Sequence, residues 1–108
     1  MSDYKTEQVS IDDASKGSVL VGNEFLTNDD LKTICDNAAS YADQQGGNVF
    51  DKGNSFVAYL NDHTDCEAFS VVVIDPGNAL YGRYGDNVYQ YYHCLNNVVY
   101  QATFFNYA

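Results

Sequence analysis

The chain has 108 residues and carries fifteen Asp and Glu against five Lys and Arg, which gives a formal charge of −10. This imbalance disfavours direct binding to nucleic acid or to an anionic membrane, and it favours a basic protein as the partner. Hydrophobic residues make up 45% of the chain and include ten Tyr and six Phe, so we expect an ordered domain and not a disordered acidic tail.

The length predicts one compact domain spanning residues 1–108. Residues 1–7 are polar and are expected to be flexible. Short strands are predicted over residues 9–11 and 18–21, the second of which is bracketed by Gly17 and Gly22.

The strongest local pattern predicts a helix over about residues 28–45. Thr27 is suited to cap its N-terminus, and Gly46-Gly47 is suited to end it. Between them an apolar stripe follows helical spacing: Leu31, Ile34, Cys35, Ala38 and Ala42.

The second half of the sequence favours strands. Residues 51–54 are expected to form a turn, and residues 81–87 a glycine-rich connection. Strands are predicted over residues 56–60, 68–74, 88–94 and 98–107, with a hairpin turn at Leu95-Asn96-Asn97. In the last strand Val98, Tyr100, Ala102 and Phe104 are expected to face the core. The fold class is therefore α+β: an antiparallel sheet of about four to six strands with one main helix packed on one face.

Three aspartates on the predicted helix are candidate partner-binding residues. Asp29, Asp36 and Asp43 are seven residues apart and so form a line that drifts by only ~20° at each step. We expect this line to face solvent, where a rigid row of carboxylates could imitate phosphates and attract Lys and Arg. The alternative is an ordinary solvated helix face.

A second acidic group, which comprises Asp62, Asp65 and Glu67, is predicted in and beside a loop between two strands. It could extend an acidic binding surface or serve solubility alone. The group lacks the alternating pattern of a calcium-binding loop, so no metal is expected there.

Aromatic residues in the glycine-rich connection are further partner-binding candidates. Tyr81 and Tyr84, together with Arg83 between them, are expected to be exposed and to contact the partner. Tyrosine is enriched in interfaces because it offers a large contact area at low entropic cost. Dimerisation through the tyrosine-rich strands stays open.

Histidine and cysteine residues occur as two pairs, His63 with Cys66 and His93 with Cys94. They could supply zinc ligands, or a nucleophile and base, but the hooks typical of zinc sites are absent from the sequence. We expect neither a metal nor another cofactor. The odd number of Cys and the polar N-terminus, which lacks an apolar signal core, favour a reducing, cytoplasmic location in the host cell.

In charge, size and expected fold, the chain resembles the small acidic inhibitors of phages and mobile elements, such as anti-CRISPR proteins and other DNA mimics. That resemblance implies a non-enzymatic inhibitor that binds a basic nucleic-acid-binding protein, for instance a CRISPR effector or another host-defence nuclease. The alternatives are an immunity protein or antitoxin against a cationic toxin, a small Cys/His enzyme, and a structural component of a phage particle.

Overall fold

A computed structural model describes residues 5–21, 29–64, 69–74, 80–84 and 88–105. The fold is α+β. In chain order the elements are β1 (Lys5–Val9), α1 (Ile11–Lys16), β2 (Val19–Val21), α2 (Asp29–Gln45), α3 (Val49–His63), β3 (Phe69–Ile74), β4 (Leu80–Tyr84), β5 (Val88–Leu95) and β6 (Val98–Phe105). An antiparallel sheet has the strand order β2-β5-β6-β3, and β1 pairs with β4 in a separate antiparallel ladder.

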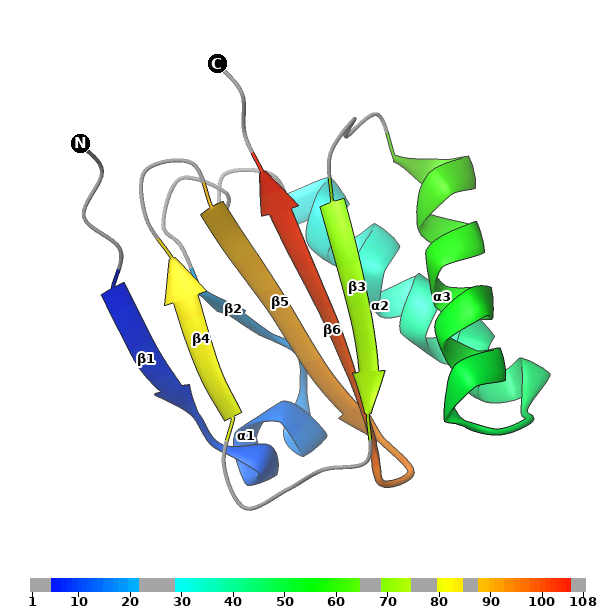
Figure 1. Cartoon of the computed structure of the whole chain (residues 1–108), viewed down its shortest axis with the longest axis horizontal. Helices are drawn as coiled ribbons and strands as arrows, with labels where there is room; N and C mark the ends of the chain where they lie inside the picture. The colour runs from blue at the N-terminus through cyan, green and yellow to red at the C-terminus, as the bar shows by residue number, and fades with distance from the viewer. Residues whose placement is uncertain (1–4, 22–28, 65–68, 75–79, 85–87, 106–108) are drawn as a thin grey trace.

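Helices α2 and α3 lie together on one side of the sheet (Figure 1). The core between these helices and the sheet contains Phe56 and Leu60 of α3, the alanines of α2, and Tyr91, Tyr100 and Phe104 of the sheet. A second core cluster joins α1 to Val21 of β2 and to Tyr92, Cys94 and Val99. Side chains on both faces of β5 and β6 are therefore buried.

The hairpin between β5 and β6 confirms the predicted turn. Leu95 pairs with Val98, and Asn96 and Asn97 between them have φ angles of 50° and 64°. Two consecutive residues with positive φ form the turn whose twist matches paired strands, and Asn tolerates that conformation better than most residues. The predicted core face of β6 is also confirmed, because Val98, Tyr100, Ala102 and Phe104 are all buried.

Helix α2 confirms the predicted helix in its body and at its end. Leu31, Cys35, Ala38 and Ala42 are buried, as is Ala39 beside them. The helix ends at Gln45, where Gly46 and Gly47 take φ angles of 73° and 91°. Glycine adopts such angles without steric strain. The predicted cap, Thr27, lies outside the described residues.

The prediction for residues 51–60 was wrong. The expected turn and strand are replaced by α3, so two long helices, and not one, cover the sheet. A reciprocal capping pair begins this helix: Asp51 N donates to Asn48 Oδ1 at 2.8 Å, and Asn48 N donates to Asp51 Oδ2 at 3.1 Å. Two backbone donors are satisfied in this way. The run Phe56–Leu60 is too short to distinguish a strand from a helix by its pattern.

Corrections are also needed near the N-terminus and in the glycine-rich segment. Residues 5–9 form β1, although residues 1–7 were expected to be flexible, and Ile11 begins α1 instead of ending a strand. Ser10 caps α1, its Oγ accepting from Asp13 N at 3.4 Å. Residues 80–84, which were expected to lie mostly in a loop, form β4 against β1. The short strand predicted near residues 18–21 is confirmed as β2.

Candidate functional site

The predicted row of exposed carboxylates on α2 is wrong for two of its three members. Asp36 and Asp43 are partly buried, with side-chain exposures of 35% and 21%. They lie about 100–120° around the helix from the middle of the buried stripe, and not opposite it. The opposite face carries exposed, uncharged residues: Thr33, Asn37, Ser40 and Gln44. The side chain of Asp29 lies outside the described part of the structure.

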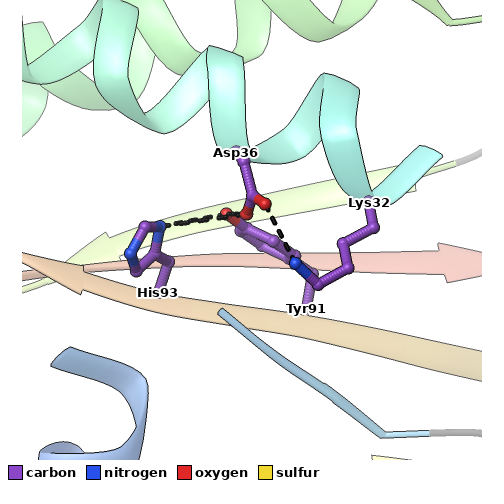
Figure 2. A network of polar contacts seen from close by, with 4 residues as sticks. All are labelled: Lys32, Asp36, Tyr91 and His93. Atoms are coloured by element: carbon purple, nitrogen blue, oxygen red, sulfur yellow. Dashed lines mark hydrogen bonds and ion pairs between the residues drawn. The ribbon is translucent and has the colours of Figure 1, made fainter. Parts of the chain in front are cut away.

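Asp36 lies in a polar network that ties α2 to β5 (Figure 2). Tyr91 Oη donates to Asp36 Oδ1 at 2.7 Å, and Lys32 Nζ donates to Asp36 Oδ2 at 3.1 Å. His93 Nδ1 lies 3.2 Å from Tyr91 Oη and 4.0 Å from Asp36 Oδ1. Since the single hydroxyl proton of Tyr91 goes to Asp36, the contact with His93 requires a proton on Nδ1.

Burial and the contacts within the network shift the pKa values of Asp36, Tyr91 and His93. Burial opposes ionisation of Asp36, but the hydrogen bonds from Tyr91 and Lys32 and the charge of Lys32 outweigh it and lower the Asp36 pKa. Burial, followed by the Asp36 contact, raises the pKa of Tyr91 far above its usual range. Burial also lowers the pKa of His93, against the pull of Asp36. The result is one ion pair, Lys32 with Asp36, beside a neutral tyrosine and a neutral imidazole.

Asp43, seven residues further along α2, makes a second set of contacts with neighbouring elements. Its Oδ2 accepts from Asn96 Nδ2 at 2.6 Å, in the β5–β6 turn. Its Oδ1 lies 3.8 Å from Lys52 Nζ of α3, whose side chain is only 16% exposed. Two aspartates of the predicted row thus bind α2 to the sheet and to the neighbouring helix. Their spacing of two turns reflects packing on one flank of α2.

The histidines and cysteines are dispersed. His93 faces the helices, while its neighbour Cys94 is buried in the cluster on the other side of the sheet. His63 Nδ1 lies 2.8 Å from Tyr59 O, and the two rings stack at 3.8 Å. Cys66 lies outside the described residues. Within the described ranges, no three His, Cys, Asp or Glu side chains converge on a point where a metal ion could bind.

Other candidate residues have mixed outcomes. Asp62 is exposed, but it lies in the last turn of α3 and not in the predicted loop between two strands. Asp65 and Glu67 lie outside the described residues. The backbone of Tyr81, Arg83 and Tyr84 lies in β4, and their side chains are outside the described part of the chain.

Three exposed carboxylates were not among the predicted partner-binding residues: Asp12 and Asp13 on α1, and Asp51 on α3. The signal for both helix starts is present in the sequence. Ser10 precedes Asp13 by three residues, and Asn48 precedes Asp51 by three, which is the spacing of an N-terminal capping pair. Recognising these pairs would have placed the three aspartates in first helical turns, where the helix dipole favours negative charge.

Asp51 and Asp62 share one side of α3. Eleven residues separate them, which is close to three full turns, so they differ by only ~20° around the axis and lie ~16 Å apart along it. Ala58 lies between them, and all three residues are exposed. This side of the helix points away from the core residues Phe56 and Leu60. Unlike the flank of α2, it presents carboxylates to solvent.

Comparisons with protein-family models, with curated proteins and with solved structures find no match for this chain. None of the helices in the described ranges has the length and apolar character needed to cross a lipid bilayer.

Proposed function

We propose that this protein is a small acidic inhibitor that binds a basic nucleic-acid-binding protein and blocks the surface where nucleic acid would bind. A CRISPR effector or another defence nuclease met by a phage or mobile element is the class of target that fits. Binding itself would inhibit, and no catalytic step is required. The partner-facing carboxylates would include those of α3 and α1, whereas Asp36 and Asp43 of α2 are engaged within the fold.

The observation that carries the proposal is the acidic excess that internal pairing leaves. Lys32 and Lys52 pair with Asp36 and Asp43, so two of the five basic residues hold the fold together. Thirteen acidic and three basic residues remain in the sequence. If each of those three neutralised one carboxylate, an excess of ten negative charges would remain, which is the net charge of the chain. Such a surface repels nucleic acid and steers the protein toward a cationic groove.

Exposed carboxylates on a helix are suited to this role because the helix holds them at fixed spacing. Arg and Lys in a nucleic-acid groove normally neutralise phosphates, and a carboxylate offers them a comparable charge-assisted acceptor. Each such contact is weak when fully solvated, so affinity depends on several acting together and on partial exclusion of water. The contact surface must therefore also include residues that remove water.

The proposal is tested by affinity capture from lysate with elution in a salt gradient. We expect a basic nucleic-acid-binding protein to elute well below ~1 M salt. At that concentration, attraction between exposed charges more than ~3 Å apart is largely screened. Asp62→Asn should weaken its capture. Gln44→Lys is the matched control, because it changes the net charge by the same amount on the neutral face of α2.

Equal loss with both variants would mean that only the total charge matters. Capture that survives high salt would contradict an electrostatic mechanism. Capture of a toxin in place of a nucleic-acid-binding protein would favour an immunity protein.

A further inference from the structure

A groove with a mixed polar and apolar lining lies beside the N-terminal half of α3, the helix that carries Asp51 and Asp62. It encloses about 290 Å³ between α3 and the edge strand β3, and it is lined by Val49, Phe50, Gly53, Asn54, Val57 and Val73. Helix α3 lies beyond β3 at one end of the molecule (Figure 1). The same helix carries Asp51 and Asp62, both of which are exposed.

Phe50 forms one rim of the groove and is 75% exposed. Together with Tyr41 it is one of two large hydrophobic side chains exposed in the described part of the chain. Leaving a phenyl ring in water forgoes the stabilisation that burial would give, and exposed apolar surface next to a groove is typical of interaction sites. The exposed ring therefore adds apolar area to the groove at the start of α3.

Gly53 forms part of the groove although it lies in the interior of α3. A Cβ there would lie 3.7 Å from Val73 Cβ and Cγ2, which is ordinary van der Waals contact, so packing does not require glycine. Glycine in a helix interior is nonetheless destabilising relative to alanine. Its absent side chain leaves the groove deeper and lets another molecule approach the backbone closely.

The residues that line the groove are compatible with an aliphatic side chain as its occupant. Its volume of about 290 Å³ is at the lower end of the roughly 300–1,000 Å³ that small-molecule pockets span. Four of its six lining residues have apolar side chains, namely Val49, Phe50, Val57 and Val73, and polar atoms also form a substantial part of its surface. An aliphatic side chain fits these walls chemically.

The surrounding charge selects among sources of that side chain. Asp51 and Asp62 are exposed on the same helix, and the whole chain has a net charge of −10. A second copy of this chain would bring like charges together, which opposes association. A basic protein would bring Lys or Arg to the carboxylates as its apolar side chain enters the groove.

We propose that the groove between α3 and β3 is the anchor site of the partner interface, and that it receives an aliphatic side chain flanked by Lys or Arg on the basic partner. This inference rests on the proposed function and adds the residues that exclude water from it. The carboxylates would govern the rate and salt dependence of association. Phe50 and the groove would govern how long the complex lasts.

Two short synthetic peptides of Lys and Arg test the proposal. They have the same charge and differ only in the central residue, which is Leu in one and Ser in the other. Titration at low salt (~50 mM), followed by NMR of the labelled protein, should show the Leu peptide binding about tenfold more tightly. Its shift changes should centre on α3 and Val73.

Phe50→Ala and Gly53→Leu should each remove the preference for Leu without changing the salt dependence, because the first removes the rim and the second fills the groove. Tyr41→Ala is the matched control, since it truncates another exposed aromatic side chain, on α2, and should leave the preference intact. Asp62→Asn should weaken both peptides equally.

Equal affinity for the two peptides would overturn the anchor site while leaving the acidic-inhibitor function standing. A concentration-dependent dimer that Phe50→Ala abolishes would overturn it in favour of a second copy. Failure of both peptides to bind at low salt would contradict the groove proposal and the proposed function together.

Discussion

Replacing Tyr91 with Phe tests the polar network between α2 and β5. The change removes one hydroxyl, which donates to Asp36 at 2.7 Å and lies 3.2 Å from His93 Nδ1, while the buried ring keeps its packing against Phe56. A hydrogen bond to a charged group contributes about 1.5–3 kcal/mol. Because 35% of the Asp36 side chain is exposed, water compensates part of the loss, so we expect Tyr91→Phe to reduce the free energy of unfolding by about 1–2 kcal/mol at pH 7.

The effect of Tyr91→Phe on the free energy of unfolding should depend on pH. The pKa of Asp36 in the folded protein lies below its ordinary value of 3.8, so the unfolded chain binds the proton more readily as the pH falls. The stabilisation from the charged carboxylate is present above pH ~4 and is lost as the pH falls through the folded pKa. The difference between wild type and Tyr91→Phe should therefore shrink below pH ~4.

Urea denaturation of the wild type, Tyr91→Phe, Asp36→Asn and the double variant at two pH values measures the coupling directly. The sum of the losses in unfolding free energy for the two single variants should exceed the loss for the double variant. A Tyr91→Phe effect that is the same at pH 7 and below the Asp36 pKa would refute the charge-assisted bond, as would strict additivity.

Three further changes have expected outcomes. Gly53→Ala should raise the free energy of unfolding by about 0.5–1 kcal/mol in urea denaturation, since the added methyl makes only ordinary contact with Val73; a loss would show that the helix interior is crowded there. Asn48→Ala should lower it by about 1 kcal/mol by removing the acceptor for Asp51 N, and Asn48→Ser should restore most of the loss. Because burial lowers the pKa of His93, the unfolded state binds more protons than the folded state just below pH 6.5, so stability should fall as the pH drops through that value, and His93→Gln should flatten the decline.

Local patterns in the sequence were sufficient for α2, for the β5–β6 turn and for the buried face of β6. Each depends on neighbours within a few positions, namely an apolar stripe ended by glycines, two asparagines between strands, and alternation along one strand. Helix α3 was missed because Gly53 and the short run Phe56–Leu60 resemble a turn and a strand, and they outweighed the capping pair of Asn48 and Asp51.

The exposure and the partners of Asp36 and Asp43 could not be predicted from neighbouring positions in the sequence. The spacing of Asp36 and Asp43 correctly placed them on one line, but the width of the buried stripe, which Ala39 extends, decides whether that line faces solvent. Their partners Tyr91 and Asn96 are more than fifty positions away, and they meet α2 only through the packing of the sheet against it. The anchor groove likewise requires β3 to lie beside α3.

The most direct measurement of the central claim is a competition assay on the captured basic protein. Labelled nucleic acid is bound to that protein, and the acidic chain is added at equal concentration at low and at high salt. The account predicts stoichiometric displacement of the nucleic acid at low salt, weaker displacement at high salt, and reduced displacement by Asp62→Asn but not by Gln44→Lys. Binding of the acidic chain without any displacement of nucleic acid would contradict it.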